Sequence, residues 1–448
     1  MGRGFWLRSG CGGMWTFLCG VMASLSVAQH PTCRTAGGGF NDTSMSLSRR
    51  PLTSSDGAVC NDGSAAQMYV RPCCDGADPG DFCNHTERSP VWLVVFGDGN
   101  ADGWCWDGPS CARRMHDPSR SSSRTLPRYF ARGGGRDDFR VGVFSKSGEG
   151  NPNFYPSYVA FIPHCSSDLF LGNSTSANGP PFFRGRSIAF AAIDALGGPM
   201  RASADAGALH VVIAGGAGVM LLLDELRARL PTGAQLSAVC DGCVLYDDNT
   251  AAAAAAAAAS LAVASGAADG VGDRGGEGVG GSGACTSEDA FSCPPSHTLP
   301  QALNLWGASS PSSLGSCRGG WRCLLDSPSV VKGRPAPPRL LAQQPLYDAA
   351  TRRAHAEASA ASVRARLSQA IEAADVSVGA ACGSAPSASL THSTFFSITF
   401  GRGLPPPSYA SALSSLVSGQ RLALIDACAG IDCNANCPSN ATHPAQAR

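Results

Sequence analysis

Apolar residues occur along this chain in short continuous runs, separated by longer stretches with helical spacing. The runs predict buried strands over residues 91–96, 141–144, 158–163, 209–214 and 339–343. Apolar positions three and four residues apart predict helices over residues 185–198, 219–230 and 350–374. Strands that alternate with helices are typical of a mostly parallel sheet with helices on both faces, so the sequence predicts an α/β fold.

The best-defined strand–turn–helix unit is GALHVVIAGGAGVMLLLDEL, residues 207–226. β-branched residues form its strand, Gly215 and Gly216 interrupt the pattern, and an apolar helix follows. In one large class of esterases this unit carries the motif G-x-S-x-G, whose sharp turn exposes a serine hydroxyl and leaves the next amide free to bind an oxyanion. This chain has the glycines but no serine, so whether the protein is an enzyme depends on this turn.

The first 28 residues have the features of a secretory signal peptide. Arg3 and Arg8 precede the apolar run 14–27, which is too short to span a bilayer, and the sequence Ser-Val-Ala that ends at Ala28 is a small-x-small cleavage site. No later run reaches the length of a membrane helix. We therefore expect a secreted, extracellular chain without a membrane span, cleaved near Ala28.

The cysteines and the glycosylation acceptors fit the same compartment. Removal of Cys11 and Cys19 with the signal peptide leaves an even number of the 20 cysteines, which is compatible with complete disulfide pairing. Metal binding by Cys240-x-x-Cys243 or Cys433-x-x-x-Cys437 is the alternative that an oxidising compartment disfavours, so we expect no metal and no cofactor. The acceptor motif N-x-S/T occurs at Asn41, Asn84, Asn173 and Asn440.

Composition divides the mature chain into an arm, a domain and a tail. Residues 29–58 are polar and glycine-rich and predict a flexible arm, a single domain is expected over 59–440, and residues 441–448 form a tail. Within the domain, residues 250–284 are alanine-rich and then glycine-rich, which favours a disordered surface insertion over a lid. The net charge is zero, so nothing indicates nucleic acid as a partner.

Motifs along the domain resemble, in order, those of the pectin acetylesterase and Notum family of secreted carboxylesterases. They are C-N-D-G-S at 60–64, G-W-C at 103–105, E-x-N-P at 149–152, F-I-P-x-C-S-S-D at 161–168, Q-P-L-Y-D-A-A at 344–350 and a Notum-type cysteine-rich ending at 424–438. The resemblance covers nearly all of residues 60–438. It implies an α/β-hydrolase fold whose triad follows the chain order serine, aspartate, histidine.

The resemblance also assigns cysteines and active-site positions in this sequence. Disulfide cysteines are implied at Cys60, Cys105, Cys111, Cys165, Cys285, Cys293, Cys317, Cys323, Cys382, Cys428 and Cys437. Asp348 matches the triad aspartate, and Ala385 stands at the position of the histidine. In an alignment without a gap Gly216 stands at the position of the nucleophile, whereas in the alternative alignment three residues that include the serine are deleted near Gly215. The oxyanion region corresponds to Gly99, Gly103, Trp104 and Ala217, in a loop longer than the family pattern.

Three departures from the family's active site therefore occur together, at the elbow, at the base and in the oxyanion loop. They favour a secreted homologue of these ester hydrolases that is catalytically impaired and retains at most binding of an acylated polysaccharide or a lipid-modified protein. One alternative is an active carboxylesterase whose elbow is misassembled in this sequence or which uses His392 as a substitute base. Another is a glycoprotein with a purely structural role. Ser166 and Ser167 match a family element that is not the nucleophile, and we interpret them as structural.

Overall fold

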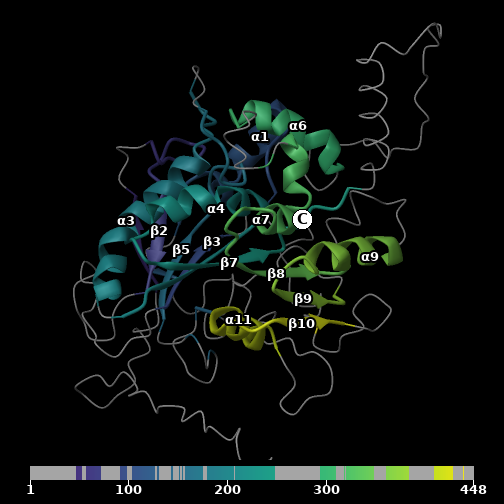
Figure 1. Cartoon of the computed structure of the whole chain (residues 1–448). Coiled ribbons are helices and arrows are strands. Elements are labelled where there is room, and N and C mark those ends of the chain that lie inside the picture. The colour runs from purple at the N-terminus through teal and green to yellow at the C-terminus, as the bar shows by residue number, and fades with distance from the viewer. Residues whose placement is uncertain are drawn as a thin grey trace, which may run out of the picture. The chain divides into compact units, whose positions relative to one another are not determined.

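The fold is built around a ten-stranded sheet in the computed structural model (Figure 1). The structure describes residues 47–52, 57–71, 91–97, 103–126, 129–130, 143–144, 151, 154, 157–174, 179–205, 207–247, 293–308, 317, 319–347, 360–382, 408–426 and 437. Across the sheet the strands are β10 (Leu422–Ile425), β9 (Val376–Ala380), β8 (Arg339–Pro345), β7 (Gln235–Asp241), β6 (His210–Gly215), β3 (Val91–Phe96), β5 (Tyr158–Ile162), β2 (Gln67–Val70), β1 (Leu47–Pro51) and β4 (Tyr129–Phe130).

Seven neighbouring strands, from β10 to β5, run parallel, and the three at the other edge pair antiparallel. The helices are α1 (Gly108–His116), α2 (Pro118–Ser121), α3 (Gly185–Asp205), α4 (Ala217–Arg229), α6 (Pro295–Leu305), α7 (Ser327–Lys332), α9 (Ala360–Ile371) and α11 (Tyr409–Ser418), with a 3₁₀ turn η5 (Gly320–Leu324). None of these described helices is long and apolar enough to cross a membrane.

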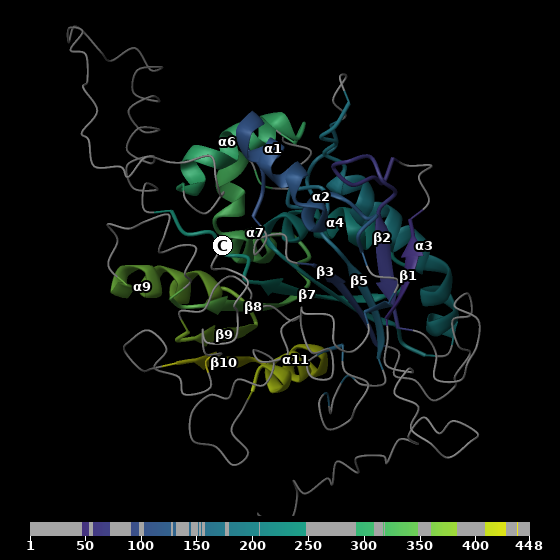
Figure 2. The ribbon, with the colours of Figure 1, turned by 180° about the vertical axis from the view of Figure 1, so that it is seen from behind.

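Helices cover both faces of the sheet, because successive side chains of a strand point to opposite sides. In β6, Val211 and Ile213 belong to the core that contains α3, α4, α7 and α9, whereas Val212 and Ala214 belong to the core that contains α11. Figures 1 and 2 show α11 beside β10 and well separated from α3 and α4. The expected mostly parallel α/β architecture is confirmed.

Two sequence expectations differ from the structure. The run 141–144 predicts a strand, but Val143 and Phe144 lie in a turn, where both are buried. The stretch 29–58 predicts a flexible arm, yet β1 lies within it and pairs with β2 on one side and β4 on the other. Backbone pairing and the burial of Leu47 and Leu52 hold residues 47–52 in place despite their charged side chains.

Disulfides connect segments that are far apart in the sequence. Long-range bridges join Cys60 to Cys165 and Cys382 to Cys437, and Cys293 is also disulfide-bonded. Short bridges join Cys105 to Cys111, Cys317 to Cys323 and Cys240 to Cys243. The last pair is therefore a disulfide in this structure rather than two metal ligands.

Candidate active site

The turn between β6 and α4 lies at the carboxyl end of a central parallel strand, which is where open α/β sheets bind ligands. β6 ends at Gly215, Gly216 is the N-cap of α4, and the helix begins at Ala217. Gly216 has φ −74° and ψ −173°, an extended conformation open to any residue. The strained turn that presents a nucleophile in this kind of fold is therefore absent at Gly216.

A second segment packs directly on the first turn of α4. A methyl group added at Gly218 would lie 1.9 Å from the carbonyl oxygen of Leu169, so only glycine permits this approach. Ser167, Leu169 and Phe170 all have positive φ, at 53°, 53° and 62°. Left-handed backbone at a residue other than glycine costs about 1–2 kcal/mol, so surrounding contacts must hold the segment in place.

The carboxylate of Asp168 supplies much of that support. Its oxygens accept hydrogen bonds from the Ser166 hydroxyl at 2.6 Å, the Phe170 amide at 3.1 Å and the Gly185 amide at 2.8 Å. The side chains of Asp168 and His164 are both fully buried, and His164 Nε2 lies 3.8 Å from the carboxylate. A buried carboxylate that accepts several hydrogen bonds is well satisfied, which lets it lock the backbone around it.

Ser166 and Ser167 lie close to a histidine and an aspartate, but neither forms a nucleophile–base pair. The Ser166 hydroxyl donates to Asp168, and the Ser167 hydroxyl donates to Asn61 Oδ1 at 2.6 Å. His164 Nε2 accepts from the Asp168 amide at 3.3 Å rather than from a hydroxyl. Both serine side chains are buried, so the arrangement supports the structural interpretation of this element.

Asn61 and Arg114 complete this buried cluster from distant parts of the chain. Asn61 Nδ2 donates to the carbonyls of Ser166 and Phe182, and Arg114 Nε donates to the Ser167 hydroxyl at 2.8 Å. The structural roles of Asn61, Arg114 and His164 are not predicted from the sequence. Only its place in the motif C-N-D-G-S distinguishes Asn61 in the sequence. Its hydrogen-bond partners lie more than 100 residues away along the chain, so the local sequence does not reveal them.

The described part of the expected oxyanion loop contacts the same segment. The amide of Cys105 donates to the Ser167 carbonyl at 3.1 Å, and Trp306 Nε1 donates to the Cys105 carbonyl at 2.9 Å. Gly103 has φ 70°, and Trp104 is buried. Segment 165–171 therefore contacts both the loop and, through Leu169, the first turn of α4, where Ala217 is also buried.

Several expected site residues lie outside the described residues. They are Asp348, Ala385, Gly99 and His392 at the candidate active site, Cys285 and Cys428 among the cysteines, and Asn41, Asn84 and Asn440 among the glycosylation acceptors. Asn173 is described and exposed, and its Oδ1 accepts from Arg184 at 3.0 Å. No group of three or more histidine, cysteine or acidic side chains with metal-binding geometry occurs in the described part of the chain.

The strand order and the strand–turn–helix unit at Gly216 are those of an α/β-hydrolase fold. The fold is similar to that of the Wnt deacylase Notum from Drosophila, with a TM-score of 0.61 at 22% sequence identity, over 88% of this chain and 100% of that one. The family model of Pectinacetylesterase matches residues 42–262. The chain belongs to the pectin acetylesterase and Notum family, as the motifs indicate.

Curated relatives come from both branches of the family. Human palmitoleoyl-protein carboxylesterase Notum is 32% identical over 161 residues, or 35% of this chain and 30% of the relative. The Notum of Schmidtea mediterranea is 29% identical over 180 residues, or 38% and 29%. Pectin acetylesterase 5 of Arabidopsis thaliana is 30% identical over 204 residues, or 44% and 45%. The alignments thus span less than half the length of these relatives.

Proposed function

We propose that this chain is a catalytically impaired homologue of the Notum and pectin acetylesterase ester hydrolases, which retains binding of an acylated ligand. The observation that carries the proposal is the turn at Gly216. There the family's nucleophile position has no hydroxyl, and its backbone is an ordinary helix N-cap rather than a strained elbow. The replacement of the expected triad histidine by Ala385 in the sequence supports the same conclusion.

The size of the expected effect explains why two such changes matter. Removal of a triad serine or histidine from subtilisin lowers kcat by about 10⁶, which corresponds to about 8 kcal/mol of barrier. Without the triad, oxyanion donors and substrate binding leave a residual acceleration of roughly 10³-fold over water. An esterase that lacks both the nucleophile and the base therefore turns over too slowly for a catalytic role.

The proposed ligand is an acylated polysaccharide or a lipid-modified protein, following the activities named for the relatives. The proposal includes export through the signal peptide 1–28, a single folded domain to residue 440 and glycosylation at the four acceptor asparagines. The disulfides of the described residues support an oxidising compartment.

Labelling with a fluorophosphonate probe tests the proposal, together with turnover of p-nitrophenyl acetate by the purified full-length chain. We expect neither labelling nor turnover above the level of heat-denatured protein. An active α/β hydrolase, labelled in parallel, is the positive control. Robust labelling at any serine, located by mass spectrometry, would contradict the proposal and favour the alternative of an active carboxylesterase with a substitute base.

Binding is tested separately from turnover. Palmitoleoylated and unmodified forms of one peptide, and acetylated and deacetylated forms of one pectin fragment, serve as matched ligand pairs. We expect the acylated member of one pair to bind at least tenfold more tightly and to be recovered intact after incubation. Equal affinity within both pairs would favour the purely structural role.

A further inference from the structure

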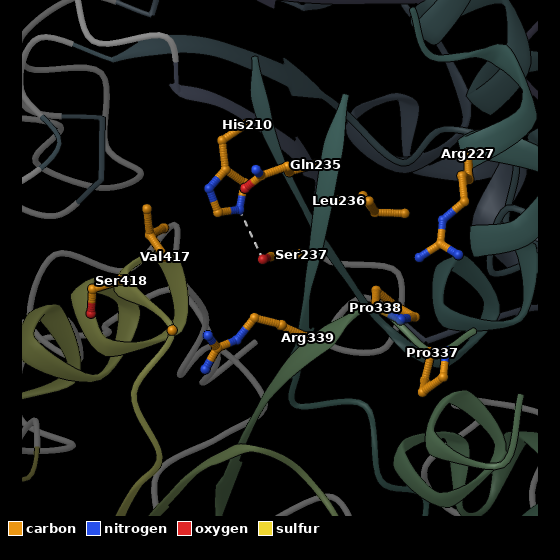
Figure 3. A pocket seen from close by; sticks show the side chains of 11 residues that line it. His210, Arg227, Gln235, Leu236, Ser237, Pro337, Pro338, Arg339, Val417 and Ser418 are labelled. Carbon is orange, nitrogen blue, oxygen red and sulfur yellow. Dashed lines mark hydrogen bonds between the residues drawn. The ribbon is translucent and has the colours of Figure 1, made fainter. Parts of the chain in front are cut away.

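The face of the sheet that α11 covers carries polar side chains at the amino ends of β6, β7 and β8. Val212 of β6 pairs with Ser237 of β7, and Ser237 pairs with Arg339 of β8. Because side chains alternate along a strand, His210 lies on the same face as Val212, which belongs to the core that contains α11. His210, Ser237 and Arg339 therefore share the face on which α11 packs (Figure 3).

Arg339 connects β8 to the end of α11. Its Nη2 donates to the Gln420 carbonyl at 3.0 Å, directly after the C-cap of the helix. The C-cap is Gly419, with φ 89°, and a methyl group added there would overlap Arg339 Nη1. The guanidinium thus packs against the backbone at the end of α11, where a cation is also favoured by the helix dipole.

The half-buried ring of His210 lies beside this contact. Its Nε2 is 2.9 Å from Ser237 Oγ (Figure 3). A cavity of about 440 Å³ is lined by His210, Ser237 and Arg339 and, from α11, by Val417, Ser418 and Gly419. Because the ring is only partly buried, solvent can deliver a proton to it.

The described residues that face His210 from the neighbouring elements are apolar, neutral or positively charged. Val91 of β3 and Gln235 of β7 are its partners in the sheet register. The end of α11 contributes Val417 and Ser418, and β8 contributes the guanidinium of Arg339. No carboxylate is among the described residues that line the cavity.

Asp375, just before β9, is the charge partner of Arg339, but it is shared. Its carboxylate accepts hydrogen bonds from Lys332 Nζ and from the Leu340 amide, both at 2.9 Å, and the charges of Lys332 and Arg339 both favour its ionised form. Two cations and one anion leave this group with a net positive charge. Asp375 therefore does not cancel the positive charge near His210.

These surroundings favour the neutral imidazole as long as α11 is in place. Burial and, to a smaller extent, the charge of Arg339 lower the pKa of His210. An ordinary histidine has a pKa of about 6.5, so His210 takes up a proton more readily when the end of α11 leaves the sheet and water reaches the ring. A fall in pH from 7.5 toward 5 consequently favours this open state over the closed one.

We propose that His210 acts as an acid-sensitive switch, which controls how tightly the end of α11 is held on the sheet. Protonation places an imidazolium and the Arg339 guanidinium in one partly buried cavity, where like charges repel each other. The repulsion is relieved when Arg339 releases the Gln420 carbonyl and both groups become hydrated. The switch does not depend on the proposed function, because His210 and Gly215 lie at opposite ends of β6.

Hydrogen–deuterium exchange of the purified full-length chain at pH 7.5 and pH 5.0 tests this proposal, with each rate corrected for the intrinsic pH dependence of amide exchange. We expect the protection of a peptide over residues 409–420 to fall by roughly threefold or more at pH 5.0. A peptide over residues 217–229, from α4 on the other face, should change less. Unchanged protection of the α11 peptide would overturn the proposal.

His210→Gln removes the titration and keeps a side chain that can hydrogen-bond to Ser237. In this variant the protection of α11 should be the same at both pH values. His116→Gln, at the exposed end of α1, is the matched control and should behave like the unsubstituted chain. An equal fall in His210→Gln and His116→Gln would overturn the proposal.

Arg339→Gln is a second test, which also serves if His210→Gln does not fold. It removes the opposing charge and the contact with Gln420, so α11 should be less protected at pH 7.5 and should lose less protection at pH 5.0. Arg421→Gln, an exposed arginine next to Gln420, is its control. The same loss of protection at pH 5.0 in Arg339→Gln and Arg421→Gln would contradict the proposed repulsion.

Discussion

At the scale of single residues, Gly216 determines the chemistry that the turn after β6 can support. As an N-cap with extended backbone and no side chain, it makes no side-chain hydrogen bond to the amides of α4. A serine at an N-cap usually turns its oxygen toward the amides of the helix rather than toward solvent. Restoring the hydroxyl is therefore not equivalent to restoring a nucleophile.

The substitution Gly216→Ser tests this distinction. We expect no fluorophosphonate labelling, because the hydroxyl caps α4 and Ala385 supplies no base. Stability should rise by a few tenths of a kcal/mol relative to glycine, as expected for a serine N-cap. Thermal denaturation and probe labelling of the same preparation measure both effects.

Gly216→Ala is the matched control for that substitution, because it adds the carbon without the oxygen. Alanine is a poor N-cap, so this variant should be less stable than Gly216→Ser by about 1 kcal/mol. Strong labelling of Gly216→Ser, with none of Gly216→Ala, would show that a base such as His392 operates, and would favour the active carboxylesterase.

At the scale of elements, the contact between α4 and segment 165–171 fixes the centre of the fold. Gly218→Ala places a methyl group 1.9 Å from the Leu169 carbonyl oxygen, so the helix or the segment must move. We expect a loss of about 2 kcal/mol or more in the free energy of unfolding, typical of overpacking against backbone. Urea denaturation monitored by circular dichroism measures it.

Gly198→Ala in α3 is the control, because a methyl group there meets nothing within 4 Å. In an exposed helix interior, alanine is favoured over glycine by up to about 1 kcal/mol, so this variant should gain stability. If both variants gained stability, the close approach of α4 to Leu169 would be wrong.

The sequence predicted the elements whose apolar runs are continuous and missed those whose runs are short or mixed. β3, β5 and β6 were predicted because nearly every residue in them is apolar, and β8 was predicted from the apolar run at residues 340–342. In β7 and β9, serines interrupt the pattern, and their hydroxyls find partners only in the folded chain: Ser237 contacts His210, and Ser377 donates to the Ile371 carbonyl. The hydrophobic periodicity of a single sequence does not predict these hydrogen bonds.

The candidate site, too, was predictable only in part. The glycine turn at residues 215–216 follows from local sequence, and the structure places it where a strand meets a helix. The cluster around Asp168 was not predictable, because it joins Asn61, Arg114 and Gly185 from three separate segments.

At the scale of the whole molecule, Asp375 makes stability depend on pH. Burial opposes ionisation of its carboxyl, but the hydrogen bonds from Lys332 and the Leu340 amide, with the charges of Lys332 and Arg339, outweigh it and lower the pKa below 3.8. Because the folded pKa lies below the unfolded value, the ionised group stabilises the fold above about pH 4 and this contribution disappears as the pH falls through the folded pKa.

Asp375→Asn should therefore lower the free energy of unfolding by about 1 kcal/mol at pH 7. The difference from the unsubstituted chain should shrink progressively below pH 4, as the pH falls toward the folded pKa and the carboxyl becomes protonated. Urea denaturation at pH 7 and pH 3 measures the two differences. Asp205→Asn, at the exposed end of α3, is the control and should have little effect at either pH. A pH-independent difference for Asp375→Asn would contradict the assignment.

The two ends of the segment that contains the expected insertion lie next to each other in the fold. Asp247 Oδ2 accepts the amide of Ser296 at 2.6 Å, so the two ends are joined across residues 248–295. Deletion of residues 250–284 should leave the midpoint of thermal unfolding nearly unchanged, since each halving of a loop saves only about 0.6 kcal/mol. A deletion of equal length, residues 247–281, removes the hydrogen bond and should lower the midpoint.

The bridge between Cys382 and Cys437 has a consequence for proteolysis. A single cut at any peptide bond between these two cysteines leaves both fragments covalently attached, because the disulfide spans the cut. Such a nicked chain should migrate as one species in a non-reducing gel and as two after reduction. Such a cut therefore leaves α11 and the edge strand β10 covalently attached to the rest of the chain.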